Sequence, residues 1–284
     1  MTTRKVRETI EGQSVLEGAG VRLRRFMGGR RLDRLDPFLL FDYFASDDPR
    51  DYLAGFPMHP HRGIETVTYM VDGLVHHKDV LGNEGDIAAG DVQWMTSGDG
   101  IFHEEMPRPV DGRMEGCQLW VNLPAKDKMS PPRYREVSAA TIPEVALPDG
   151  GRLRVVAGEA FGVKGAVGEI AVDPLYLDVS LPPGGSITLP VGPESAAFAF
   201  VLRGSGRFES ESGAGQAVEA PLMVVFDDGD EVRAAADREL RFLLIAGRPI
   251  REPVARYGPF VMNTPAEIQQ ALEDLNNGTF VKRR

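Results

Sequence analysis

Short segments in which apolar and polar residues alternate, each bounded by turn residues, constrain the fold of this chain most strongly. Residues 65–72 (ETVTYMVD) are followed by Gly73, and residues 91–96 and 116–123 have the same character. Successive side chains of a β-strand point to opposite faces, so this alternation predicts half-buried strands. The 32 glycines and 21 prolines supply frequent turns. The sequence therefore predicts an all-β sandwich or barrel.

A similar series of segments begins again after about residue 140. Residues 197–203 (AFAFVLR) precede a glycine, as residues 66–72 do, and residues 223–229 are similar to residues 92–98. In both cases the paired segments are about 130 residues apart, which indicates a degenerate internal duplication of two β-barrels. A chain of 284 residues is long enough for two modest domains. We expect a first domain over residues 1–135 and a second over 136–284.

One helix is expected near the end of the chain. Thr264 can act as its N-cap, Pro265 occupies the first helical position, and Glu267 completes a capping box. Three apolar residues then form a stripe at helical spacing, and Gly278 can end the helix. We expect this helix to return to the first domain and pack there, without a chemical role.

Composition limits the possible partners and location. The 42 acidic and 32 basic residues give a net charge of −10, which disfavours direct binding to nucleic acid. The charged N-terminus lacks the apolar core of a signal peptide, and no segment has the 18 consecutive apolar residues of a membrane helix. The single cysteine, Cys117, excludes an intramolecular disulfide. We expect a cytoplasmic monomer that does not associate with membranes.

Two short motifs contain three of the five histidines. These motifs are His59-Pro-His61 and His103-Glu-Glu105. Because residues i and i+2 of an extended segment share a face, each motif can direct two side chains toward one point. Two neighbouring strands would then present three imidazoles and one carboxylate to a common centre. Such a set with open positions suits non-haem iron, whereas four ligands would saturate a structural zinc.

Other acidic and histidine residues are alternatives to this set. Glu65 lies four residues after His61 and would share its face in a strand, so it is a rival ligand. Glu104 should point away from the centre. His76 and His77 can direct at most one ring inward, and we expect structural or exposed positions for them. Residues 136–284 contain no histidine or cysteine, so the second domain cannot form the same site.

At this point the sequence resembles the pirin family of the cupin superfamily, and the resemblance covers nearly the whole chain. It implies a bicupin, which has two antiparallel, jelly-roll-like β-barrels and a metal in the N-terminal one alone. The family's metal ligands correspond to His59, His61, His103 and Glu105. The general cupin pattern would instead use Glu65 as the carboxylate. The motifs that carry the resemblance are residues 35–44 (LDPFLLFDYF), 56–69 (FPMHPHRGIETVTY), 90–98 (GDVQWMTSG), 100–107 (GIFHEEMP), 118–123 (QLWVNL), 245–253 (IAGRPIREP) and 258–264 (GPFVMNT).

The resemblance also implies a cofactor and an activity. The family metal is typically iron, so we expect one Fe(II) ion, with Mn, Ni, Cu or Zn as alternatives. Pirin-like proteins are associated with quercetin 2,3-dioxygenase activity, which implies a flavonol and O2 as substrates. Glu105 is the candidate to accept the flavonol 3-hydroxyl proton. The alternatives are a non-enzymatic, iron-dependent redox regulator that binds a protein partner, either a transcription factor or a metabolic enzyme, and a purely structural metal.

Overall fold

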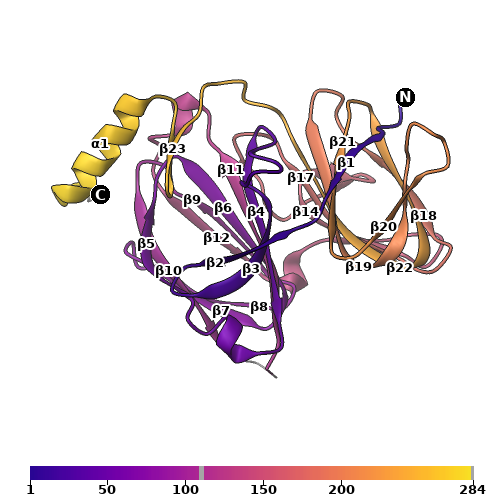
Figure 1. The fold of residues 1–284 in the computed structure, drawn as a ribbon, viewed down its shortest axis with the longest axis horizontal. Helices are drawn as coiled ribbons and strands as arrows, with labels where there is room; N and C mark the ends of the chain where they lie inside the picture. Colours follow the sequence, from indigo (N-terminus) through magenta and orange to yellow (C-terminus); the bar gives the residue numbers. More distant parts are fainter. Residues whose placement is uncertain (109–111, 283–284) are drawn as a thin grey trace. The chain divides into compact units, whose positions relative to one another are not determined.

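The computed structural model describes residues 1–108 and 112–282. The last two residues of the expected second domain, Arg283 and Arg284, lie outside this range. Among the described residues the chain is mostly β-structure and has one α-helix, α1 (Pro265–Asn276), near its C-terminus (Figure 1). The three strands expected in the first half correspond to β6 (Ile64–Asp72), β9 (Val92–Thr96) and β11 (Met114–Asn122). The predicted β-class and C-terminal helix are confirmed.

The chain divides into two compact units, each built from two segments that are far apart in the sequence. We call residues 13–139 with 250–284 the histidine unit and residues 1–12 with 140–249 the second unit. Residues 1–12 join the second unit because β1 (Val6–Ile10) pairs with β21 (Leu222–Phe226). Residues 1–12 belong to the first domain expected from the sequence, residues 1–135, but they lie in the second unit. Residues 250–284 lie with the histidine unit, where the C-terminal helix had been expected.

Two antiparallel sheets form most of the histidine unit. The larger sheet has the strand order β12-β9-β6-β11-β4-β3-β2, and the smaller has the order β5-β10-β7-β8. Among the described residues, no strand pairing joins the two sheets into one closed ring, so the unit is a jelly-roll-like sandwich, which fits the expected cupin fold, and not a continuous barrel. The remaining strands are β2 (Gln13–Glu17), β3 (Val21–Met27), β4 (Phe38–Ser46), β12 (Arg133–Val137), β5 (Phe56–His61), β7 (Leu74–Asp79), β8 (Glu84–Ala88) and β10 (Ile101–Arg108).

The second unit is built on one long sheet with the main strand order β1-β21-β19-β22-β17-β14-β13. Strand β22 (Glu231–Gly247) is long enough to pair with β18 (Ser186–Pro190) at one end and with β17 (Leu175–Leu181) at the other. An apolar core cluster that includes Leu153, Phe208 and Phe242 lies within this unit. Its other strands are β13 (Glu144–Ala146), β14 (Arg152–Ala157), β15 (Glu159–Ala160), β16 (Val163–Lys164), β19 (Ala196–Phe208) and β20 (Gln216–Glu219).

The strand order repeats between the units, as a duplication would produce. The sequence β9-β6-β11-β4-β3 in the histidine unit corresponds to β21-β19-β22-β17-β14 in the second unit. Gly73 and Gly204, the glycines that follow the paired segments, have φ values of +84° and +72°. A Cβ would lie 2.6 Å from the Arg113 carbonyl oxygen at the first position and 1.5 Å from that of Glu239 at the second. Both turns therefore require glycine.

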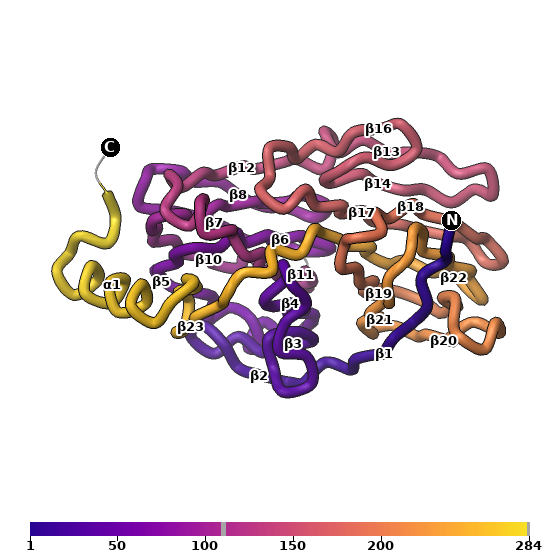
Figure 2. Tube along the Cα trace, turned by 90° about the horizontal axis from the view of Figure 1, so that it is seen from above, coloured from indigo at the N-terminus to yellow at the C-terminus, as the bar shows by residue number. Residues whose placement is uncertain are grey.

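The C-terminal segment forms part of the histidine unit (Figure 2). After the hairpin β23 (Ala255–Tyr257) and β24 (Phe260–Met262), the Thr264 hydroxyl accepts from the Glu267 N–H at 3.3 Å and the Glu267 carboxylate accepts from the Thr264 N–H at 2.8 Å. This is the predicted capping box, which satisfies two backbone groups at the helix start. Ile268 and Ala271 turn inward against the apolar residues of the segment.

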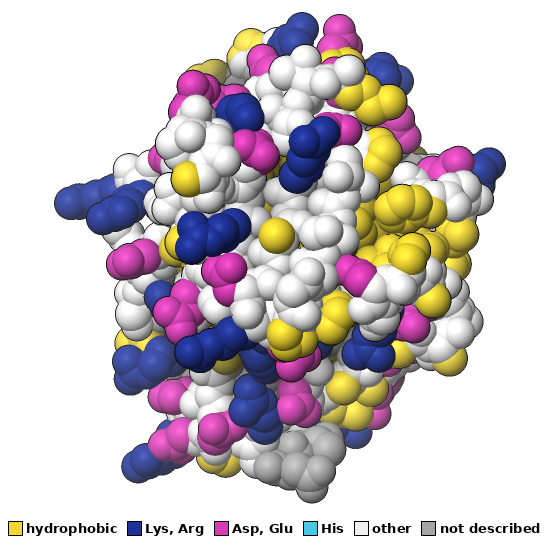
Figure 3. Space-filling view, turned by 90° about the vertical axis from the view of Figure 1, so that its right-hand side faces the viewer, with side chains coloured by type: hydrophobic (Ala, Val, Ile, Leu, Met, Phe, Trp, Pro, Cys, Tyr) yellow, Lys and Arg dark blue, Asp and Glu magenta, His cyan; other side chains and the backbone are white. Residues whose placement is uncertain are grey.

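The surface carries charges of both signs. Figure 3 shows acidic and basic side chains intermixed over the face that it presents, without a large field of one sign. Such a face lacks the continuous positive stripe that attracts a phosphate backbone. Within the described part of the chain, no helix is long and apolar enough to span a membrane.

Candidate metal centre

Strands β5 and β10 bring the two histidine motifs together. They pair antiparallel, so that His59 lies opposite His103 and His61 lies opposite Ile101. β5 is an edge strand of its sheet, a position that tolerates Pro60 between the two histidines. The register shifts between His103 and Glu105, which places Glu105 opposite Phe56. The three imidazoles therefore meet at one end of the paired strands.

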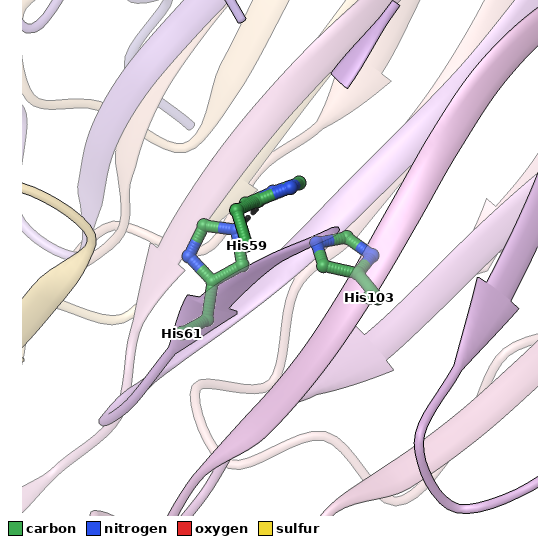
Figure 4. A group of neighbouring side chains, drawn as sticks. All are labelled: His59, His61 and His103. Atoms are coloured by element: carbon green, nitrogen blue, oxygen red, sulfur yellow. Dashed lines mark hydrogen bonds between the residues drawn. The ribbon is translucent and has the colours of Figure 1, made fainter. Parts of the chain in front are cut away.

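The three imidazole rings are close enough to bind one ion (Figure 4). One ring nitrogen from each of His59, His61 and His103 can be chosen so that all three lie within 4.8 Å of one another. The Nε2 atoms of His59 and His61 are 3.1 Å apart. The ring centroids of His59 and His103 are separated by 4.4 Å, and those of His61 and His103 by 5.1 Å. Imidazole nitrogens at such spacing suit a first-row transition metal.

Burial keeps the His61 and His103 rings neutral. It lowers the pKa of His61 to about 3, with a smaller contribution from the nearby His59. It also lowers the pKa of His103 well below its ordinary value. Among the described residues, His103 Nε2, which faces the other two rings, has no hydrogen-bond partner (Figure 4). A buried nitrogen with a free lone pair is costly unless it has a ligand, so the residues present fit a metal ion.

Glu105 lies beside this cluster but is not one of the three groups within 4.8 Å. Its side chain is nearly buried, and its Oε1 accepts a hydrogen bond from the Thr68 hydroxyl at 3.0 Å. It lines the same cavity as His59 and His61. The carboxylate is therefore adjacent to the histidines and accessible from the cavity.

The rival carboxylate, Glu65, is directed elsewhere. Its Oε2 accepts from the Trp94 indole N–H at 3.0 Å, and its Oε1 accepts from the Thr96 hydroxyl at 2.7 Å. Burial raises its pKa, although these two hydrogen bonds oppose the shift. Glu104 lies opposite Lys78 on β7 and does not line the cavity. Both oxygens of Glu65 are thus occupied by groups of the protein.

His76 and His77 have opposite environments. His76 is partly exposed, and its ring nitrogens contact Asp86 at 2.6 Å and Glu84 at 3.2 Å. His77 is completely buried and lies next to His103, with 5.3 Å between their ring centroids. One ring therefore points inward, as the alternation allows.

A cavity of about 550 Å³ opens beside the histidines. This volume is within the range of small-molecule sites, about 300–1,000 Å³. Trp120 places its ring edge-on to His61 at 5.1 Å, and the Arg256 guanidinium lies 4.8 Å from the Trp120 ring. The cavity thus combines metal-binding nitrogens, a carboxylate, an aromatic surface and a cation. Its other lining residues include Leu23, Arg25, Leu40, Asp42, Phe44, Phe56, Gln118 and Pro259.

Arg25 and Asp42 form an ion pair within the cavity lining. The Arg25 guanidinium donates two hydrogen bonds to the Asp42 carboxylate, at 2.9 and 2.7 Å. Burial lowers the pKa of Arg256, which has no such bidentate partner among the described residues and whose Nε donates to the Gly258 carbonyl at 3.2 Å. Arg256 is therefore the cation best placed to meet a ligand.

The second unit has a larger cavity of about 650 Å³. Its lining contains no histidine or cysteine, because residues 140–249 have neither. The larger of these two cavities thus lacks the donors of a transition-metal site, and the smaller one holds the candidate centre.

Sequence reasoning did not identify three features of this site. Trp120 and Arg256 were not singled out, since nothing local to either residue marks it as a lining residue. His77 was expected to be structural or exposed, although its two-residue spacing from Asp79 could have suggested a shared face. The three histidines of the two motifs are brought together as their spacing indicated.

The chain is similar to a group of two-domain cupins. The family model "Pirin" matches residues 20–121, and "Pirin C-terminal cupin domain" matches residues 176–281. A "Pirin-like protein" of Caulobacter vibrioides is 47% identical over 99% of this chain and 100% of its own length. Another, of Solanum lycopersicum, is 45% identical over 92% of this chain and 88% of its own length. The crystal structure of a quercetin 2,3-dioxygenase from Acinetobacter baumannii is 36% identical, has a TM-score of 0.88, and covers 98% of both chains.

Proposed function

The chain belongs to the pirin family, and from this premise we propose that it is a metal-dependent dioxygenase that opens the flavonol ring of quercetin-like substrates with O2. Of the structures similar to it, the quercetin 2,3-dioxygenase of Acinetobacter baumannii matches over nearly the full length of both chains. One observation from this chain carries the proposal: His59, His61 and Glu105 all line a cavity large enough for a small aromatic molecule.

We propose that His59, His61, His103 and Glu105 hold one divalent ion, with iron(II) as the expected metal. When bound, this ion would supply Lewis-acid chemistry that lowers the pKa of the flavonol 3-hydroxyl and orients O2. The neutral imidazoles of His61 and His103 are ready to donate lone pairs at ordinary pH. The carboxylate adds the negative charge that this set of ligands otherwise lacks.

The lining residues would bind and orient the substrate. Phe44, Phe56 and Trp120 provide apolar and aromatic surface against which flat rings can pack. Arg256 can stabilise the negative charge that develops when the 3-hydroxyl loses its proton. Glu105 is the acidic side chain that borders both the cavity and the histidines, so we assign it the role of accepting that proton.

Oxygen uptake by protein of known metal content tests the proposal. Metal-replete protein should consume O2 with quercetin and release carbon monoxide, as the resemblance to quercetin dioxygenases implies. A flavone that lacks the 3-hydroxyl should be a poor substrate, because it has no group to deprotonate. Apo protein should be inactive, and adding the metal back should restore activity.

A different outcome would support the alternative role as a regulator. Metal-replete protein that neither binds quercetin nor consumes O2 would overturn the enzyme proposal. In that case, pull-downs from reduced and oxidised lysates should show whether oxidation of the metal changes affinity for a protein partner. Partner binding that follows the redox state would then favour the iron-dependent regulator.

A further inference from the structure

A fourth histidine lies directly behind the proposed metal ligands. His77, on β7, is completely buried, and its Nδ1 lies 3.4 Å from Nδ1 of His103 on the paired strand β10. The cavity is lined by His59 and His61 but not by His77. His77 is thus placed to contact the proposed metal ligand His103 but not a substrate bound in the cavity.

The other edge of the His77 ring faces a carboxylate. Its Nε2 lies 3.7 Å from Oδ2 of Asp79, whose side chain is also fully buried. Backbone N–H groups of Leu81 and Asn83 donate to Asp79 Oδ1 at 2.8 and 3.0 Å, and the Asn83 amide donates to Oδ2 at 2.7 Å. The turn between β7 and β8 therefore holds this carboxylate in place.

Tyr134 fixes the plane of the His77 ring. The two rings stack with 4.7 Å between centroids and 24° between planes. The Tyr134 hydroxyl in turn donates to Glu136 Oε2 at 3.0 Å. His77 is thus stacked on an aromatic ring, with Nδ1 beside His103 and Nε2 facing Asp79.

The donor and acceptor roles of imidazole nitrogens decide where His77 and His103 carry their hydrogens. Two Nδ1 atoms can share a hydrogen bond if one of them carries a hydrogen and the other a lone pair. If His77 were the donor, neutral His103 would carry its hydrogen on Nε2 and could not bind a metal there. If His103 is the donor, its Nε2 has a free lone pair. His77 must then carry its own hydrogen on Nε2, which is the nitrogen that faces Asp79.

We propose that His77 is a positioning residue for the metal site: the chain Asp79–His77–His103 fixes His103 as the tautomer protonated on Nδ1, so that Nε2 is free to hold the ion. This inference rests on His103 being a metal ligand, as proposed above, and it extends the site to two residues that do not touch the metal. The 3.7 Å separation of His77 from Asp79 is longer than a hydrogen bond, and we expect it to shorten when metal binding polarises His103. Losing such an outer partner typically weakens metal binding about 10–100-fold.

Imidazole nitrogen NMR of the wild-type protein tests the tautomers directly. In the zinc-loaded full-length protein, long-range ¹H–¹⁵N spectra should show His103 with its hydrogen on Nδ1 and His77 neutral with its hydrogen on Nε2. His77 protonated on Nδ1, or on both nitrogens, would overturn the inference. Failure to bind zinc at all would instead contradict the metal site, so the two claims can fail separately.

Substitutions of His77 measure how much this residue contributes to zinc affinity. In competition with a chromophoric chelator, His77→Phe, which keeps a ring on Tyr134, should bind zinc about 10–100-fold more weakly. His77→Gln, whose amide oxygen can still accept from His103, should recover part of that loss. The neighbouring His76→Phe is the matched control and should bind zinc like the wild type. A folded His77→Phe protein with wild-type zinc affinity would contradict the proposal.

Discussion

The Arg62 guanidinium, one residue beyond His61, forms an ion pair with the Asp274 carboxylate of helix α1 at 2.7 Å. The arginine is almost fully buried and also donates to the backbone carbonyls of Asp99 and Phe280, at 2.7 and 3.2 Å. Its guanidinium lies 4.3 Å from the Phe280 ring centroid. These contacts hold the C-terminal segment against the residue that directly follows β5, the strand that carries two of the proposed ligands.

Removing the carboxylate of this pair should destabilise the histidine unit. Asp274→Ala leaves a buried guanidinium with neutral acceptors alone, and hydrogen bonds to charged groups contribute about 1.5–3 kcal/mol. We expect a loss of that size in the free energy of unfolding, measured with urea. Glu273→Ala is the control, because Glu273 pairs with the exposed Gln269 and should change stability by less than about 0.5 kcal/mol. Equal effects of the two substitutions would contradict the role of the ion pair.

The buried Lys128 should make the free energy of unfolding depend on pH in the alkaline range. The Lys128 ammonium donates to the Gly63 and Val261 carbonyls and to the Asn122 side chain, at 2.8–2.9 Å. Burial lowers its pKa from 10.5 to about 8, with weaker opposition from Glu252 and Glu267. At a pH between 8 and 10.5, Lys128 is protonated in the unfolded chain and neutral in the folded chain. The free energy of unfolding should therefore rise with pH over this range.

The comparison with Lys128→Met isolates this effect. From pH 7 to pH 10, the free energy of unfolding of the wild type should increase relative to the variant, by roughly 2–4 kcal/mol. The lost hydrogen bonds shift the variant's stability at every pH, whereas the slope reports the titration of Lys128. Parallel pH profiles for the two proteins would rule out a lowered pKa at this lysine.

Local patterns explain why parts of this fold could be predicted. The capping box of Thr264 and Glu267 lies within four residues, and the alternation of His59 with His61 spans three. Such features depend on backbone geometry that neighbouring residues set for themselves. The resemblance to the pirin family added the two-domain architecture, which the repeated segments had already suggested.

Features that depend on pairing between distant segments could not be read from the sequence. The contact of His77 with His103 depends on the register of β7 against β10, and no local pattern fixes that register. Arg256 reaches Trp120 from a segment more than a hundred positions away in the chain. The pairing of β1 with β21 is similarly non-local, and it moves residues 1–12 out of the expected first domain.

The two candidate carboxylates should behave differently when neutralised. Glu105→Gln should weaken metal binding or abolish turnover, because it removes the charge beside the histidines. Glu65→Gln should retain the metal, since Glu65 interacts with Trp94 and Thr96. Metal content and oxygen uptake of both variants check this. Loss of metal from the Glu65 variant, with retention in the Glu105 variant, would assign the site to the general cupin pattern.

Arg256 should contribute to flavonol affinity. Arg256→Met keeps an unbranched stem over Trp120 but removes the charge, and a desolvated cation beside the aromatic rings of a bound flavonol contributes about 1–2 kcal/mol. We therefore expect quercetin to bind about 5–30-fold more weakly, as measured by the change in its own absorption on titration. Arg24→Met is the control, because Arg24 lies over Phe26 and does not line the cavity. Unchanged affinity in the Arg256 variant would remove this residue from the binding site.

Elemental analysis of the native protein and two histidine variants tests the central claim most directly. The native protein should contain about one transition-metal ion per chain, most of it iron, as a single mononuclear site requires. His103→Ala should contain almost none and should also be less stable, by the binding free energy that the metal contributes to the folded state. His76→Ala, which alters a partly exposed ring, should keep the full complement. Full metal content in the His103 variant would contradict the assignment of the site.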